Sequence, residues 1–208
     1  MKILITAGPT RERIDAVRFI TNRSTGKMGY SIAEAAVEAG HDVTLISGPT
    51  SLNIPQHLMF IPVESAAEMA EAVKEYASES DAVIMTAAVA DYRPVEIAPG
   101  KIKKGDSDLL LRLERTEDIL AGLGKVKKPN QILVGFAAES DDLEIYARDK
   151  LKRKNLDYIV ANDISQTDRG FGSDNNAVIV FSTSGERTEI PLDSKKGIAR
   201  TILKLIFG

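Results

Sequence analysis

The sequence predicts an α/β protein in which a largely parallel sheet carries helices on both faces. Short apolar, β-branched runs alternate with helical patterns along most of the chain. The first run, residues 2–7, leads through Gly8 toward a helical pattern, which presents backbone N–H groups and a positive helix end to an anion. With 208 residues and 43% hydrophobic content, residues 1–208 are expected to form a single domain.

The patterns place each element in order. Strands are expected over residues 2–7, 42–47, 58–63, 81–86, 131–136 and 157–161. Helices are expected over residues 25–39, 65–79, 117–124 and 142–154. Right-handed crossovers between parallel strands place helices on both faces of the sheet, so the predicted core is Rossmann-like.

Two segments break this alternation. Between Tyr92 and Arg115, residues 101–104 and 109–113 are two extended stretches around a polar turn, which predicts a hairpin flap. Residues 176–192 contain two further stretches around a Thr-Ser-Gly turn, which predicts a C-terminal antiparallel β-hairpin before a final helix. Exposed hairpin edges favour pairing with a second copy, so we expect a homodimer.

The connection after the first strand is the most informative loop. Residues 8–24 have no apolar periodicity and contain several arginines, and connections longer than about 12 residues are usually functional or disordered. Neither the Gly-x-Gly-x-x-Gly fingerprint nor the P-loop spacing fits this region, which disfavours dinucleotide dehydrogenases and P-loop NTPases. The stretch Ser24-Thr25-Gly26 either begins a plain helix with a solvated Lys27 or leaves N–H groups for a phosphate or carboxylate.

Composition excludes several classes of function. The absence of cysteine rules out a disulfide scaffold, a thiol nucleophile and a cysteine zinc site, and it suits the cytoplasm. Two histidines are too few for a histidine metal cage. A net charge of -3 argues against a general nucleic-acid surface. No apolar run is long enough to cross a membrane, and no signal-peptide layout is present, so we expect no membrane association.

The residues that follow the predicted strands should meet at one crevice, because ligands of open parallel sheets bind beyond the carboxyl ends of the strands. Asp91 follows a run of small residues from Ala87, so it either holds Mg²⁺ on nucleotide phosphates or ends the strand as a turn residue. Phe136 either flanks a base or is buried. Asn162 and Asp163 follow the strand over 157–161.

Two groups of lysines allow a functional and a structural interpretation. Lys101, Lys103 and Lys104 lie on the predicted flap, where they either close over phosphates or protect an exposed edge strand from pairing. Lys150 and Lys154 share one face of a helix, where they either meet an anion or complement the C-terminal helix dipole.

A set of ordered motifs spans nearly the whole chain: AGPTRE at 7–12, DAVRFITNRSTGKMG at 15–29, AAVADYRP at 87–94, KIKK at 101–104, VGFAAE at 134–139, AND at 161–163 and FGSDNN at 171–176. This set closely resembles the phosphopantothenoylcysteine synthetase family, the phosphopantothenate–cysteine ligases of coenzyme A biosynthesis.

The resemblance implies a CTP-dependent ligase that joins 4'-phosphopantothenate to L-cysteine through an acyl-cytidylate, releasing pyrophosphate and then CMP. It implies CTP and Mg²⁺ as co-substrate and metal, and no FMN. Family members are often fused to an N-terminal decarboxylase, so a fused or separate decarboxylase is an expected partner. Eukaryotic relatives tend to use ATP, and sequence does not fix that choice.

The resemblance also assigns residues. It makes Asn22 and Lys101 the catalytic residues, with Asn22 serving the second step and Lys101 the activation. Nucleotide contacts are implied at Ala87, Asp91, Lys101, Glu117, Asp118, Ile119, Leu120, Phe136, Lys150 and Lys154. Weaker substrate candidates are Gly8, Arg11 and Lys27, and Asp91 is the metal candidate. At residues 116–118 this chain has Thr-Glu-Asp where many family members have Asn-Pro-Asp, which leaves the backbone contacts there less certain.

Two other classes compete with a ligase. An NAD(P)-linked reductase would need the glycine fingerprint and an acidic residue after the second strand, where the chain has Ser47-Gly48-Pro49. A non-catalytic nucleotide-binding module would not need the flap lysines for any activity.

Overall fold

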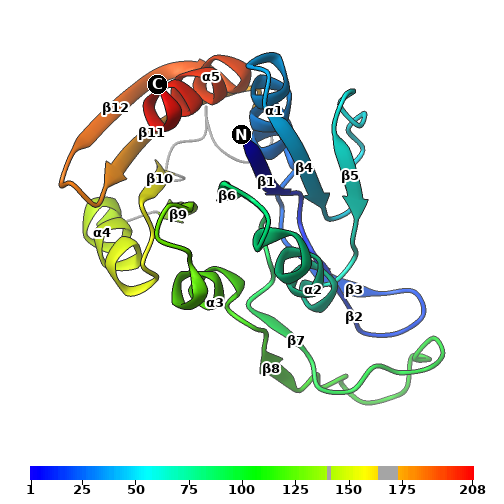
Figure 1. The fold of residues 1–208 in the computed structure, drawn as a ribbon. Coiled ribbons are helices and arrows are strands. Elements are labelled where there is room, and N and C mark those ends of the chain that lie inside the picture. Colours follow the sequence, from blue (N-terminus) through cyan, green and yellow to red (C-terminus); the bar gives the residue numbers. More distant parts are fainter. Residues whose placement is uncertain (140–141, 164–172) are drawn as a thin grey trace.

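The computed structural model describes residues 1–139, 142–163 and 173–208. Its centre is an eight-stranded sheet in the order β12-β11-β10-β9-β6-β1-β4-β5 (Figure 1). Six strands are parallel: β1 (Lys2–Ala7), β4 (Asp42–Ser47), β5 (Met59–Pro62), β6 (Ala82–Met85), β9 (Ile132–Glu139) and β10 (Tyr158–Asp163). The α/β, Rossmann-like prediction is therefore confirmed.

The C-terminal hairpin consists of β11 (Asn175–Ser182) and β12 (Arg187–Ser194). Its first strand pairs antiparallel with β10, so the hairpin extends the main sheet instead of standing apart from it. Alternate side chains of β11, among them Val178 and Val180, are buried, and this gives the strand a face to pack beneath the last helix. That helix, α5 (Lys195–Phe207), begins where β12 ends.

Helices cover both faces of the sheet (Figure 1). One face carries α1 (Lys27–Glu38) and α5, and the other carries α2 (Ala66–Ala77), α3 (Ile119–Val126) and α4 (Leu143–Arg153). Because side chains alternate along a strand, Ile3 and Ile5 of β1 join the first core and Leu4 joins the second. Burial on both faces explains why the strands are continuous apolar runs.

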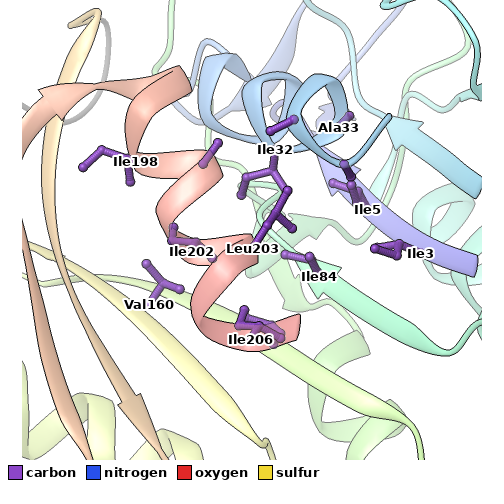
Figure 2. Packing of buried hydrophobic residues seen from close by; sticks show 14 of the residues in the cluster. Ile3, Ile5, Ile32, Ala33, Ile84, Val160, Ile198, Ile202, Leu203 and Ile206 are labelled. Atoms are coloured by element: carbon purple, nitrogen blue, oxygen red, sulfur yellow. The ribbon is translucent and has the colours of Figure 1, made fainter. Parts of the chain in front are cut away.

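The core between α1, α5 and the sheet is dense in isoleucine. Figure 2 shows Ile32 of α1 beside Ile202 and Leu203 of α5, above sheet residues that include Ile84 and Val160. At an aliphatic site of this kind, truncation to alanine costs about 2–5 kcal/mol. This packing fixes the starts of α1 and α5 next to each other, which matters for the site described below.

The loop after β1 contains a hairpin that the apolar pattern did not predict. Strands β2 (Arg11–Arg13) and β3 (Phe19–Thr21) pair antiparallel outside the main sheet. Polar side chains hold this hairpin in place: the buried Glu12 carboxylate accepts from the N–H of Ala66 at the start of α2, at 2.8 Å. A hairpin stabilised by such distant polar contacts leaves no period-2 signal in the sequence.

The predicted flap is a hairpin, but its strands lie elsewhere. Strands β7 (Tyr92–Pro94) and β8 (Leu113–Arg115) pair antiparallel, and residues 95–112 between them form no strand. The expected extended stretches are therefore wrong: residues 101–104 form no strand, and of residues 109–113 only Leu113 belongs to β8. Instead of pairing across the hairpin, the N–H of Ile102 donates to Asp15 Oδ2 on the β2–β3 turn, at 3.0 Å. We call residues 92–115 the arm.

No helix in the described ranges is long and apolar enough to span a bilayer.

Candidate functional site

A cleft of about 490 Å³ lies where the carboxyl ends of β6, β9 and β10 meet the start of α1. The chain runs outward from β1 to β4 and β5, then returns to β6 on the other side of β1 and continues to β9 and β10. Such a reversal of strand order leaves a crevice at the carboxyl edge of the sheet. The topology thus places the cleft where ligands of this architecture bind.

Tight glycine packing brings α1 against the sheet beside this cleft. Gly26, the residue before α1, has φ +80, and a Cβ there would meet Thr50 Cγ2 at 2.8 Å and Gly8 Cα at 3.2 Å. A Cβ on Gly29 would overlap Thr86 Oγ1 and Ala7 Cβ. Side chains at these positions would push the helix away from the sheet. The glycines therefore set how closely the start of α1 approaches the cleft.

Buried threonines of the first strand and its loop hold the segment after β6. Thr6 Oγ1 accepts from the N–H of Ala87 at 3.2 Å, and Thr10 Oγ1 accepts from the N–H of Ala90 at 2.9 Å. The side-chain amide of Asn22 donates to the carbonyl of Ala88 at 2.9 Å. Asn22 is thus fixed on the cleft wall, directly beside the small residues that follow β6.

The part of the cleft near α3 and α4 combines two lysines with a capping carboxylate. Asp118 caps α3 by accepting from the N–H of Ala121 at 3.0 Å, and it forms a 2.8 Å ion pair with Lys154. Burial opposes ionisation of Asp118, but the hydrogen bonds from Lys154 and Ala121 outweigh it, so the pKa of this carboxyl lies below its ordinary value. Lys150 Nζ donates to the carbonyl of Phe136 at 3.1 Å.

The part of the cleft near the starts of α1 and α5 is also cationic. Lys27 forms a 2.6 Å ion pair with Asp174, and Lys195 is the first residue of α5. Burial, and next the charge of Lys27, lower the pKa of Lys195, while Asp174 opposes the shift. The hydrogen bond from Lys27 lowers the pKa of Asp174. This arrangement favours an anion over a neutral ligand.

The structure brings most of the predicted site residues together. The cleft is lined by Asn22, Lys27, Ala87, Asp91, Glu117, Asp118, Ile119, Leu120, Phe136, Lys150 and Lys154. These come from the loop between β3 and α1, the start of α1, the segment after β6, the start of α3, β9, and α4 with the residue that follows it. Among them, Glu117 also forms a 2.7 Å ion pair with Lys74 of α2.

Three predicted residues do not line this cleft. Gly8 packs against Gly48, whose carbonyl oxygen would lie 2.8 Å from a Cβ. The guanidinium of Arg11 lies over the ring of Phe19, 4.6 Å from its centroid. Lys101 is exposed on the arm, one residue before the point where the arm is bonded to the β2–β3 turn.

The cleft also has lining residues to which the motifs gave no role, among them Asn176 and Lys195. Asn176 ends the FGSDNN motif, whose first two residues lie outside the described ranges. Lys195 is 7% exposed. It gives no sequence signal, because a lysine in the first turn of a helix is ordinarily a solvated surface residue.

Carboxylates do not gather into a metal cage. Across residues 1–139, 142–163 and 173–208, no group of three or more His, Cys, Asp or Glu side chains could hold a metal ion. Asp91 lines the cleft with an exposed carboxylate, whereas the carboxylates of Glu117 and Asp118, which also line it, are paired with Lys74 and Lys154. That fits Mg²⁺ bound through substrate phosphates with one carboxylate, because this ion usually keeps waters and uses few protein ligands.

Comparison with known proteins is consistent with this geometry. The family model for the C-terminal domain of DNA/pantothenate metabolism flavoproteins matches residues 1–208. The coenzyme A biosynthesis bifunctional protein CoaBC of Bacillus subtilis is 56% identical over 205 residues, which cover 98% of this chain and 50% of that protein. The chain thus spans about half the length of the curated relatives it matches.

Solved structures agree with the family match. The crystal structure of the C-terminal domain of CoaBC superposes with a TM-score of 0.85 at 50% identity, covering 99% of this chain and 93% of that one. Cab2 in complex with phosphopantothenate-cysteine has a TM-score of 0.79 at 20% identity, covering 99% and 84%, which is a likeness in fold. The chain therefore belongs to the family of the C-terminal domain of DNA/pantothenate metabolism flavoproteins.

Proposed function

We propose that this chain is a phosphopantothenate–cysteine ligase that uses CTP to activate its acid substrate, acting in coenzyme A biosynthesis. The observation that carries the proposal is the cleft itself, where Asn22 and the small residues after β6 meet a lysine pair near Phe136. The family match and the CoaBC relatives support this class of reaction.

The first step activates a carboxylate. A carboxylate oxygen of 4'-phosphopantothenate forms a bond to the α-phosphorus of CTP, and the bond from that phosphorus to the bridging oxygen breaks, releasing pyrophosphate. The product is an acyl-cytidylate. Catalysis here needs positioning and neutralisation of charge more than a side-chain nucleophile. Lys150 and Lys154 line the cleft where they would neutralise charge on the nucleotide.

The second step forms the amide. The amine of L-cysteine attacks the acyl carbon, the bond from that carbon to the phosphate oxygen breaks, CMP leaves, and the amine loses a proton. Asn22 is the residue best placed for this step, because its amide is already fixed beside Ala88 on the cleft wall. A neutral donor there can stabilise the developing oxyanion without adding charge.

We assign Lys101 to the activation step, which requires the arm to move. Lys101 is exposed and does not line the cleft, so residues 95–112 must approach the cleft when substrates bind. Loop closure of this kind excludes water and completes a site. The exposed apolar side chains of the arm, Leu109, Leu110 and Leu111, would be covered in a homodimer, which we also propose.

The remaining partners follow from the same reaction. Mg²⁺ bound to the phosphates would be held by Asp91, and it would supply neutralising charge. The chain needs no FMN for this chemistry. A phosphopantothenoylcysteine decarboxylase, fused or separate, would take up the product. We further propose that residues 1–208 act as a single domain in the cytoplasm.

Pyrophosphate release tests the proposal. Purified protein is assayed with CTP and 4'-phosphopantothenate together, with each alone, and with ATP in place of CTP at equal concentration. We expect release only when nucleotide and acid are both present, faster with CTP than with ATP. Folded protein that releases no pyrophosphate with either nucleotide would contradict the ligase assignment, and a preference for ATP would contradict the nucleotide assignment.

A further inference from the structure

Asp15, on the turn between β2 and β3, is a buried charge that the proposed reaction does not yet include. It is 2% exposed, although the residues that follow it on the turn, Ala16, Val17 and Arg18, are exposed. A carboxylate is almost never buried this far without partners. The partners of Asp15 therefore indicate what this side chain holds in place.

The two carboxylate oxygens have different partners. Oδ1 of Asp15 accepts from the N–H groups of Val17 and Arg18, both at 2.8 Å, in a local turn of the kind that aspartate ordinarily forms. Oδ2 accepts from Arg18 Nε at 2.9 Å and from the N–H of Ile102, 87 residues along the chain, at 3.0 Å. The local turn needs only the first oxygen, so the second oxygen has a separate role on the arm.

Both backbone groups of Ile102 are bound by this ion pair. Its N–H donates to Asp15, and its carbonyl accepts from Arg18 Nη2 at 2.8 Å. Within residues 101–115, all of which the structure describes, Ile102 alone is not exposed. Hydrogen bonds to charged groups are stronger than those between neutral groups. The pair of Asp15 and Arg18 therefore fixes the backbone of one residue in an otherwise exposed segment.

A second bond holds the other end of the same short loop. The N–H of Ala98 donates to the carbonyl of Ile14, which precedes Asp15 on the turn, at 3.1 Å. The loop Ala98–Ile102 is thus attached to the turn at both of its ends. Lys101 is the fourth residue of this loop. The turn therefore fixes the main chain on both sides of Lys101, although Lys101 itself is exposed.

The same hairpin leads to Asn22. Strand β3 ends at Thr21, whose Oγ1 donates to the carbonyl of Thr10 at 2.7 Å. Asn22 follows, with its amide bonded to the carbonyl of Ala88 on the cleft wall. The turn thus connects the loop of Lys101 to the strand before Asn22. One hairpin holds both residues that we assign to the reaction.

We propose that Asp15 is a positioning residue for the activation step: through Ile102 it holds the loop of Lys101 on the β2–β3 turn, at a fixed place relative to Asn22. The inference rests on the proposed ligase function, and in particular on the assignment of Lys101 to activation. The bonds to Ile102 are kept when the arm approaches the cleft, so the turn and the loop move together. Such positioning matters because a misplacement of about 1 Å can cost much of the rate.

The variant Asp15→Asn tests this role by steady-state kinetics. Asparagine keeps the size of the side chain and one oxygen for the turn, but it places an NH2 group against the N–H of Ile102. We expect kcat for pyrophosphate release to fall by about five- to ten-fold, because Lys101 is then misplaced in the transition state. The KM values for CTP and for 4'-phosphopantothenate should stay within about two-fold of the wild type. Asp108→Asn, which removes an exposed carboxylate elsewhere on the arm, is the matched control and should match the wild type.

A double-mutant cycle shows whether Asp15 acts through Lys101. In the Lys101→Gln protein, Asp15→Asn should change kcat by less than about two-fold, because the group that Asp15 places is already gone. A merely structural role of Asp15 would slow both proteins by the same factor, and that result would overturn the proposal. An Asp15→Asn protein as active as Asp108→Asn would overturn it as well.

Ile102→Pro breaks the same contact from the arm, and it serves if Asp15→Asn does not fold. Proline has no N–H, so Asp15 loses this donor while the turn keeps its own bonds. Asp108→Pro is the control for a proline in the arm. We expect kcat to fall by about five-fold or more for Ile102→Pro and to stay unchanged for Asp108→Pro. Equal activities of the two proline variants would contradict the proposal.

Amide hydrogen exchange separates this inference from the ligase assignment, because it needs no reaction. The amides of Ala98 and Ile102 should exchange at least about ten-fold more slowly in the wild type than in Asp15→Asn, at a temperature at which both are folded. Equal exchange rates would show that Asp15 does not hold the loop and would overturn the inference, whatever the ligase assay gives. Slow exchange in a wild type that releases no pyrophosphate would support the attachment of the loop and contradict the ligase assignment instead.

Discussion

The cleft wall beside the sheet and the arm are held in place by different kinds of contact. The segment after β6 is held by buried threonine hydroxyls and by glycines that admit no side chain. The arm carries exposed apolar residues and is tied at Ile102 by contacts to Asp15 and Arg18. The difference teaches that one part of the chain, the wall, can position the substrates while another part, the arm, supplies the charge of Lys101. Substitutions on the wall should cost stability, and substitutions on the arm should cost activity alone.

The largest expected effect tests the arm. Lys101→Gln should slow pyrophosphate release by about 100- to 1000-fold, the range seen when one transition-state-stabilising group is removed. The melting temperature should stay unchanged, because Lys101 is exposed. Lys103→Gln, on the same loop, is the matched control. A fall in melting temperature for Lys101→Gln would contradict this distinction between wall and arm, because the arm would then contribute to the stability of the fold.

The next effect tests the glycine packing at the wall. Gly29→Ala should lower the free energy of unfolding by about 1–3 kcal/mol, the typical cost of overpacking, because its Cβ would overlap Thr86 Oγ1. Urea unfolding measures this. Gly122→Ala on α3 is the control, since its Cβ would meet Glu117 Oε1 at 3.6 Å, an ordinary contact. Equal stabilities of the two variants would show that the wall is not tightly packed.

Asn22 lies on the wall but is assigned a role in the reaction, so its substitution should have an intermediate effect on activity. Asn22→Asp removes the donor to the Ala88 carbonyl and places a carboxylate beside an anionic intermediate. The cysteine-dependent step should slow by about ten-fold or more, because a hydrogen bond is replaced by repulsion. Trapping the acyl-cytidylate separates the two steps. Equal losses in both half-reactions would contradict the assignment of Asn22 to the second step.

The smallest effect concerns the contact between the arm and the β2–β3 turn. The Asp15 carboxylate is buried and accepts hydrogen bonds from Arg18 Nε at 2.9 Å, from the N–H groups of Val17 and Arg18 at 2.8 Å each, and from Ile102. The hydrogen bond from the Arg18 side chain, with those from the backbone, holds the pKa of this carboxyl far below its usual range.

Because the pKa of Asp15 is lower in the folded than in the unfolded state, its stabilising effect is fully present above the unfolded pKa. That stabilisation is lost as the pH falls through the acid range toward the folded pKa. Asp15→Asn should therefore lower the melting temperature at neutral pH, and its difference from the wild type should shrink below about pH 4. A difference that stays constant between pH 3 and pH 7 would contradict this role.

Much of the fold followed from local pattern. The six parallel strands and the helices between them appear as alternating apolar runs, because strands buried on both faces must be apolar. Strand ends in such a sheet converge, so Asp91 and Phe136 could be placed in one crevice from the sequence. The arm could not be placed correctly, because residues 101–104 resemble a strand but bond to a turn distant in sequence.

The sequence by itself determined the alternation of strands and helices, and with it the edge of the sheet where the cleft opens. Only the tertiary structure placed Lys195 on the cleft wall, left the side-chain oxygens of Asn162 and Asn176 without a hydrogen-bond partner, and took Lys101 away from the cleft. The physical reason is the distance along the chain over which each signal acts. Periodicity reports the burial of neighbouring residues along one element, whereas these side chains owe their positions to contacts between elements far apart in the chain.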